Sequence, residues 1–226
     1  MIKAVVFDMF ETLITLFTEH TYFGEDAASD AGVDPVIYRK VWHENEADRT
    51  TGKITIEEGI AETLRKLDVY SDELLEKIVG KRLFALKETF DQIPDESVAL
   101  LEGLKKKGIK IGLITNTFSD ERSLIRNSKL IPYFDAVRIS YEEGILKPDP
   151  RLYLSIMEEL DVKPEECLYV GDGGSRELYA AREVGMKPLQ ASWFRELAFE
   201  PHIPCPVMPE FPQVMHQMDV LNYLME

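Results

Sequence analysis

The sequence predicts an α/β protein: a parallel sheet covered by helices on both faces, with a helical insertion after its first strand. Four apolar runs have strand length, and each is followed by helical periodicity, which is the alternation that builds such a sheet. The segment 17–89 contains helical patterns but no comparable apolar run. The four predicted strands are Ala4–Phe7, Ile109–Ile114, Ala136–Ile139 and Cys167–Val170.

Helices are predicted wherever apolar side chains recur at helical spacing between start and stop signals. Thr55 followed by Glu58, and Ser71 before an apolar run, are N-cap signals in the insertion, and Gly108 after three lysines is a stop signal. We also expect a surface helix at the end of a proline-rich tail. The predicted helices are Ile56–Leu67, Asp72–Leu86, Asp95–Lys107, Leu152–Leu160 and Val214–Leu224.

Composition excludes several classes of function. The chain has 226 residues, 45% of them hydrophobic and 30% charged, which is typical of a folded globular protein. Because 26 basic residues face 41 acidic ones, the net charge of −15 disfavours binding to nucleic acid or to an anionic membrane.

The N-terminus and the cysteines indicate where the protein resides. The first apolar run is broken at once by Asp8, so it lacks the long apolar segment of a signal peptide or a membrane helix. Cys167 and Cys205 lack the spacing of metal ligands, and two cysteines are too few to stabilise a chain of this size by disulfide bonds. We therefore expect a cytoplasmic protein.

Polar residues follow each predicted strand. Asp8 follows the first, Thr115 and Asn116 the second, Lys147 lies in the loop after the third, and Asp172 follows the fourth. Ligands of open parallel sheets bind outside the carboxyl ends of the strands. These four sequence-distant positions should therefore converge in one crevice.

The order and spacing of these segments resemble the four motifs of the haloacid dehalogenase superfamily. The resemblance rests on Asp8–Thr12, Leu113–Asn116, Lys147–Pro150 and Gly171–Asp172 with Glu177. It implies a hydrolase with a Rossmann-like, doubly wound core, at residues 1–16 and 90–226, and a helical cap at residues 17–89.

The resemblance also implies a role for each residue. Asp8 would be the nucleophile, forming a covalent ester or acyl phosphate that water then cleaves. Thr115 and Asn116 would hold the transferring group, while Lys147 would neutralise charge on the nucleophile and on the substrate anion. The substrate would be a small molecule, most simply a phosphorylated metabolite, and the protein a monomer or homodimer.

A magnesium ion is expected in the same crevice. The resemblance implies that Asp8, Asp172, Glu177 and the main-chain carbonyl of Phe10 form the cation site, and hard oxygen ligands suit Mg²⁺. The charge of the crevice also indicates a cation. Three carboxylates in one crevice must be protonated or compensated, and Lys147 alone is insufficient.

Phe10 departs from the pattern of the phosphatase members. Those members carry a second Asp two residues after the nucleophile, which protonates the leaving oxygen and then activates water. A phenyl ring cannot transfer a proton, so a rate factor on the order of 10² to 10⁴ must come from elsewhere or be unnecessary.

Three interpretations stay open. The protein is a phosphatase whose acid is replaced by Glu11, a cap residue or water, or whose substrate has a good leaving group. It is a dehalogenase, since halide leaves without a proton and those relatives have an aromatic tyrosine at this position. Or it is a weakly catalytic binder of small phosphorylated ligands. The segment from Gly171 to Glu177 favours the first over the second, because it resembles the metal-binding motif of phosphatases.

Overall fold

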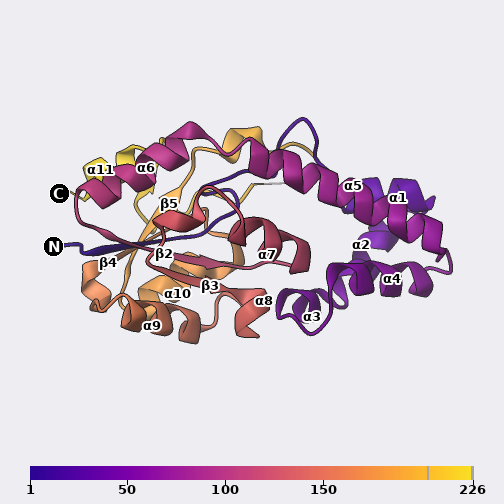
Figure 1. Ribbon diagram of the computed structural model, residues 1–226, viewed down its shortest axis with the longest axis horizontal. Helices are drawn as coiled ribbons and strands as arrows, with labels where there is room; N and C mark the ends of the chain where they lie inside the picture. Colours follow the sequence, from indigo (N-terminus) through magenta and orange to yellow (C-terminus); the bar gives the residue numbers. More distant parts are fainter. Residues whose placement is uncertain (203, 225–226) are drawn as a thin grey trace.

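Six strands form one parallel sheet in the computed structural model, which describes residues 1–202 and 204–224 (Figure 1). The strand order β3-β2-β1-β4-β5-β6 places the first strand in the middle of the sheet. The predicted α/β class and the first four strands are confirmed, whereas β5 and β6 were not predicted. The strands are β1 (Ala4–Phe7), β2 (Lys110–Thr115), β3 (Ala136–Ile139), β4 (Cys167–Gly171), β5 (Lys187–Ala191) and β6 (Gln213–Val214).

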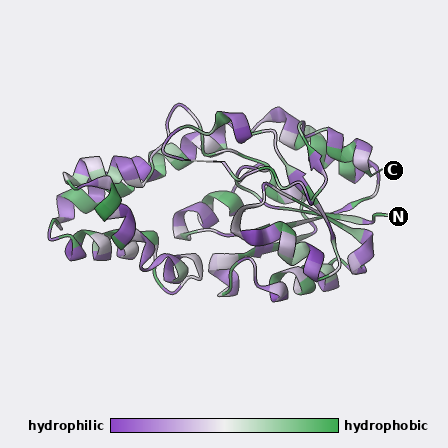
Figure 2. Ribbon diagram, turned by 180° about the vertical axis from the view of Figure 1, so that it is seen from behind, coloured by the Kyte–Doolittle hydropathy of each residue, from purple (hydrophilic) through white to green (hydrophobic). Residues whose placement is uncertain are grey.

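The two faces of the sheet are buried under different helices. Side chains of β1 alternate between them: Val5 and Phe7 join one apolar cluster, and Ala4 and Val6 join the other. The helices α6 and α11 lie over the first face, and α9 and α10 over the second (Figure 1). Hydrophobic residues accordingly run along the strands and the inward sides of these helices (Figure 2). The sheet is therefore doubly wound.

The helices that pack on the sheet alternate with the strands along the chain, as expected from the sequence. Four short 3₁₀ segments, at Ile131–Tyr133, Pro164–Glu166, Gly174–Arg176 and Arg195–Leu197, lie in the connections. The helices are α6 (Asp95–Lys106), α7 (Ser119–Arg126), α8 (Ser140–Glu143), α9 (Pro150–Glu159), α10 (Glu177–Glu183) and α11 (Asp219–Tyr223).

The insertion between β1 and β2 forms a helical cap at the other end of the molecule (Figure 1). It has its own apolar cluster, which includes Tyr38, Ile60, Leu64 and Ile78. Both predicted N-caps are confirmed: Thr55 and Glu58 form a capping box, and Ser71 caps the longest helix. The helices are α1 (Gly24–Ala31), α2 (Pro35–His43), α3 (Glu46–Thr50), α4 (Ile56–Lys66) and α5 (Asp72–Asp91).

The predicted boundary between core and cap at residues 89/90 falls within α5, near its end, and the division at 16/17 and 89/90 stays a prediction. Residues 203, 225 and 226 of the predicted core lie outside the described residues. Across the described part, none of the helices combines the length and apolar character needed to cross a bilayer.

The tail differs from the prediction. A helix over Val214–Leu224 was expected, but β6 takes its first residue and α11 begins only at Asp219. The reason is pairing with β5: Gln190 N donates to Pro212 O at 2.8 Å and Ser192 N to Val214 O at 3.0 Å. Helical periodicity does not detect so short an edge strand.

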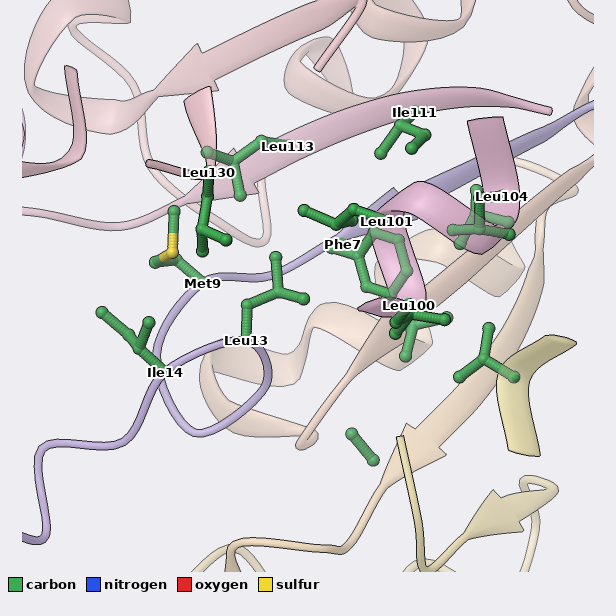
Figure 3. Close-up of a cluster of buried hydrophobic side chains, with 14 of the residues drawn as sticks. Phe7, Met9, Leu13, Ile14, Leu100, Leu101, Leu104, Ile111, Leu113 and Leu130 are labelled. Atoms are coloured by element: carbon green, nitrogen blue, oxygen red, sulfur yellow. The ribbon is translucent and has the colours of Figure 1, made fainter. Parts of the chain in front are cut away.

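The loop after β1 is anchored in the core on both sides of Asp8. Phe7 packs with three leucines of α6, and the residues just beyond Asp8 turn back into the same cluster (Figure 3). Because both neighbours of Asp8 are fully buried, the backbone that carries its carboxylate is held in place. The anchoring side chains of the loop are Met9, Leu13 and Ile14.

Candidate active site

Strand register brings the predicted polar residues together at the carboxyl end of the sheet. Phe7 lies level with Leu113 of β2 and with Val170 of β4. Asp8, one residue further on, donates its main-chain N–H to Val170 O at 2.9 Å. Asp8 therefore stands between the ends of β2 and β4, beside Thr115 and Asp172.

Lys147 reaches this point from the loop between α8 and α9. Its Nζ lies 2.6 Å from Asp8 Oδ1 and 2.6 Å from Glu177 Oε2, and all three side chains are buried. Burial opposes the charge of Lys147, but Asp8 and Glu177 outweigh it and raise its pKa. Lys147 therefore stays cationic between two carboxylates.

Glu177 is fully buried at the start of α10, and protein groups hold both of its oxygens. Tyr169 donates its hydroxyl to Oε2 at 2.8 Å, and Gly173 N donates to Oε1 at 3.0 Å. A Cβ at Gly171 would lie 2.1 Å from Oε1, so only glycine admits this carboxylate. Glu177 thus fixes Lys147 and the loop after β4.

Asp172 lies on the other side of Asp8, in the loop after β4. Gly174 N donates to Asp172 Oδ1 at 2.9 Å, and Gln190 Nε2 donates to the main-chain oxygen of Asp172 at 2.9 Å. Burial, Glu177 and Asp8 raise the pKa of Asp172 to about 8. Burial and Glu177 likewise raise the pKa of Asp8 to about 7, against the opposing effect of Lys147.

These carboxylates could hold a cation. Asp8, Asp172 and Glu177 each offer an oxygen, and within the described residues these three oxygens lie within 4.8 Å of one another. The donor set is hard oxygen, which suits Mg²⁺. Since Lys147 compensates one of three negative charges, a divalent cation fits the remaining charge of the cluster.

Asn116 ties the loops of the site together. Its Oδ1 accepts from Lys147 N at 2.8 Å, and its Nδ2 lies 3.3 Å from Ser175 Oγ. Thr115 is fully buried at the end of β2, with its hydroxyl 3.4 Å from Asn116 O. Asn116 therefore lies beside Lys147 and the loop after β4, and Thr115 lies next to Asn116.

Phe10 and Glu11 occupy the positions after the nucleophile. Phe10 is half-buried and packs against the main core cluster. The Glu11 carboxylate accepts from Thr15 Oγ1 and Leu16 N, both at 2.8 Å, and lines a cavity of about 20 Å³ together with Asp172. Glu11 is thus close to the acidic cluster although it is not part of it.

Three further residues of this region were not predicted from the sequence. Tyr169 has a polar hydroxyl within an apolar strand, which was the one available signal. Gln190 is fully buried in β5, and Ser175 lies in the loop after β4. The patterns around Gln190 and Ser175 gave no such signal.

Polar contacts join the cap to the core at several points, including one of 3.2 Å between Glu25 of α1 and His202 of the tail. Arg82 of α5 pairs with Asp120 and Glu121 at the start of α7, at 2.7 and 2.6 Å. Ser140 donates its hydroxyl to Thr50 O at 2.8 Å. The cap is therefore fastened on both sides of the loop that follows Thr115 and Asn116.

The comparisons with known proteins define the class. The family model of the haloacid dehalogenase-like hydrolases matches residues 2–185, and the chain belongs to this family. A relative, the glyceraldehyde 3-phosphate phosphatase of Pyrococcus furiosus, is 34% identical over 138 residues, 58% of this chain and 54% of its own length. In three curated relatives, this phosphatase among them, the matched segment spans 37%, 54% and 37% of the relative's own length.

Solved structures share the fold. The L-2-haloacid dehalogenase from Xanthobacter autotrophicus aligns with a TM-score of 0.63 at 21% identity, over 100% of this chain and 99% of that one. An enzyme of the same family from Bacteroides thetaiotaomicron, in complex with magnesium and inorganic phosphate, gives 0.60 at 19% identity, over 84% and 94%. The similar proteins thus include phosphatases and dehalogenases.

Proposed function

We propose that this protein is a Mg²⁺-dependent phosphatase-type hydrolase that acts on a small phosphorylated metabolite with Asp8 as the nucleophile. The observation that carries the proposal is the charge of the crevice. Asp8, Asp172 and Glu177 are gathered around one ammonium group, from Lys147, in a buried site. That arrangement favours binding of a divalent cation, and a cation next to a nucleophilic carboxylate suits phosphoryl transfer.

In this proposal Asp8 attacks phosphorus through a carboxylate oxygen. A bond forms between that oxygen and phosphorus, and the bond from phosphorus to the leaving oxygen breaks. Water then cleaves the acyl phosphate and regenerates Asp8. Lys147 holds the carboxylate through Oδ1 and neutralises charge that develops on the phosphoryl group.

The other predicted residues hold the phosphoryl group and the cation in place. Asn116 offers a donor beside Lys147 and also fixes the backbone of Lys147, and Thr115 lies next to Asn116. Asp8, Asp172 and the main-chain carbonyl of Phe10 would hold Mg²⁺, with Glu177 meeting it through water, because the Glu177 oxygens already accept hydrogen bonds from the protein. Bound Mg²⁺ would supply positive charge to the phosphoryl oxygens.

A second candidate is supported by Phe10. A halide leaves carbon without a proton, so a 2-haloacid dehalogenase would not need an acid at this position. The third alternative, a binder of phosphorylated ligands with weak catalysis, rests on the same residue. The acidic cluster favours the phosphatase, because a dehalogenase that works without metal gains nothing from uncompensated carboxylates around its nucleophile.

Measurement of turnover distinguishes the phosphatase, the dehalogenase and the weakly catalytic binder. Acetyl phosphate and 4-nitrophenyl phosphate would be assayed with Mg²⁺ and with a chelator, beside 2-chloropropionate, using Asp8→Asn as the control. We expect phosphate release that requires both Mg²⁺ and Asp8. Halide release without metal would favour the dehalogenase, and ligand binding without turnover of any substrate would favour the binder.

A further inference from the structure

A cavity of about 500 Å³ lies between the cap and the core. Cap helices, the loop after β1 and the start of α7 contribute to its wall, and most of the wall is apolar or aromatic. A volume of this size is in the range of pockets that enclose a small organic ligand. The wall includes Phe17, Tyr22, Tyr38, Trp42, Ile78 and Phe118.

This cavity adjoins the candidate active site. Phe17 lines it and also lines the small cavity at Glu11 and Asp172, so one ring forms a wall of both. Phe118, which also lines the cavity, comes two residues after Asn116. A phosphoryl group at Asp8 would therefore have its organic substituent directed past Phe17 into the cap.

The acidic and basic side chains on the wall already have partners. Arg82 pairs with Glu121, and Arg39 and His202 both pair with Glu25. His43 pairs with Glu46 at 2.7 Å. Among the described residues of the wall no charge is left to bind a second ionic group, so a neutral apolar substituent fits the cavity better than a carboxylate or an ammonium.

Phe10 restricts the leaving group independently. Without an acid beside the leaving oxygen, that oxygen departs as an anion, and its departure is easier the lower the pKa of its conjugate acid. That pKa is about 10 for a phenol, as in tyrosine, and roughly 16 for an alkyl alcohol, similar to water. An aromatic ester tolerates the absence of the acid, whereas an alkyl ester does not.

We infer that the physiological substrate is an aryl phosphate whose neutral aromatic ring occupies the cap cavity. This inference rests on the proposed function and specifies its substrate class. Asp8 forms a bond to phosphorus, the bond from phosphorus to the phenolic oxygen breaks, and the electron pair leaves on a phenolate that takes a proton from solvent. Water then hydrolyses the acyl phosphate.

The inference is tested by a substitution that fills part of the cavity. Ala85 of α5 lines it and is buried, so Ala85→Phe should occupy part of the space for the ring. Ala47→Phe, on the exposed surface of α3, is the matched control. We expect Ala85→Phe to lower the ratio of kcat/KM for 1-naphthyl phosphate to kcat/KM for acetyl phosphate at least about tenfold, and Ala47→Phe to leave it unchanged.

Binding is measured separately from turnover. In the Asp8→Asn background, fluorescence titration with 1-naphthyl phosphate should show binding that Ala85→Phe weakens at least about tenfold. Binding that Ala85→Phe does not change, or a wild-type preference for glycerol phosphate over 1-naphthyl phosphate, would overturn the inference. If the wild type cleaves neither ester nor acetyl phosphate yet binding still depends on Ala85, the cavity is the ligand site and only the proposed catalysis fails.

Discussion

Lys147 Nζ lies 2.6 Å from Asp8 Oδ1, and both side chains are buried. The Lys147 ammonium group comes from a loop more than a hundred residues further along the chain than Asp8. Asn116 Oδ1 accepts a hydrogen bond from the main-chain N–H of Lys147. The pair fixes one carboxylate oxygen of Asp8, but it compensates a single charge in a cluster that also contains Asp172 and Glu177.

Lys147→Met should destabilise the metal-free protein in a pH-dependent way. Removing the cation leaves buried carboxylates unpaired, a loss of about 3 to 5 kcal/mol in the free energy of unfolding at pH 8. At pH 5 the loss should be smaller, because Asp8 and Asp172, whose pKa values are raised, are then protonated. Urea unfolding in chelator measures both values.

The control for this variant is Lys53→Met. Lys53 pairs with Asp48 on the surface, where its side chain is 70% exposed, so its removal should change the free energy of unfolding by less than about 1 kcal/mol. Equal losses for Lys147→Met at pH 5 and pH 8 would contradict the assignment of repulsion as the cause.

Asp172→Asn and Glu177→Gln should separate a metal ligand from a positioning residue. Asp172→Asn removes a proposed ligand, and we expect the Mg²⁺ affinity to fall by more than the factor of about 10 to 100 that loss of an outer-shell partner costs. In Glu177→Gln the affinity should fall less, while kcat falls because Lys147 loses a partner at 2.6 Å. Calorimetric titration with Mg²⁺ and steady-state kinetics give the two readouts. The same loss of affinity in both variants would make Glu177 a direct ligand.

The pH dependence of stability follows from Asp172. Its pKa is raised from 3.8 to about 8 by burial, Glu177 and Asp8. A carboxyl group with a raised folded-state pKa stabilises the fold below its ordinary pKa, and this contribution is lost as the pH rises through 8. The Tm of the metal-free protein should therefore fall between pH 6 and pH 9.

Mg²⁺ should reverse this trend, with a larger rise in Tm at pH 8.5 than at pH 6.5, because the cation competes with protons for the same oxygens. Thermal scans with chelator and with Mg²⁺ at both pH values test it. Asp172→Asn serves as the control and should weaken the dependence, leaving the part that Asp8 contributes. A larger effect of Mg²⁺ at the lower pH would contradict the prediction.

Much of the core could be predicted from the sequence because its signals are local. Each of the first four strands is an apolar run, and each is followed by a polar residue that parallel pairing carries to the same edge. The register of Phe7 with Leu113 and Val170 then brings Asp8 to Thr115 and Asp172. The parallel topology of the sheet was therefore enough to predict that the motifs converge.

The supporting contacts could not be predicted, because they depend on which surfaces meet in space. The Gln190 amide bonds the main chain of the Asp172 loop and of the tail, two segments brought together by the folding of β5 and β6. The cap cavity is similar, because Phe17 and Phe118 are far apart in the sequence and line one cavity only in the folded protein.

Gln190→Leu should loosen the loop that carries Asp172. The side chain donates to Asp172 O and Pro206 O and accepts from Met208 N, each at 2.9 Å in the interior. Replacing it with an apolar side chain leaves these groups unpaired, at about 1 to 3 kcal/mol for each buried group. We expect a lower Tm and weaker Mg²⁺ binding.

The control for Gln190→Leu is Gln213→Leu, at an exposed position of the neighbouring strand β6. It should change Mg²⁺ affinity little. If Gln190→Leu lowered Tm but left Mg²⁺ affinity and kcat at the wild-type values, Gln190 would serve the fold and not the position of Asp172.

Phe10→Asp should install the acid that the sequence lacks. If the absent acid is what limits alkyl esters, their kcat should rise by a factor on the order of 10² to 10⁴, the usual contribution of a general acid and base. Acetyl phosphate, whose leaving group needs no proton, should gain little. Because Phe10 packs against the core cluster, Tm should fall, and kinetics must be measured well below it.

Phe10→Asn is the matched control, since it places a polar side chain of similar size at this position but has no proton to transfer. A gain on alkyl esters in Phe10→Asp alone, with a pH profile that reports one additional ionising group, would mean that the phenyl ring restricts this enzyme to good leaving groups. Equal rates for both variants would mean that another residue already supplies the proton, and Glu11, beside Asp172 in the same small cavity, is then the first to replace.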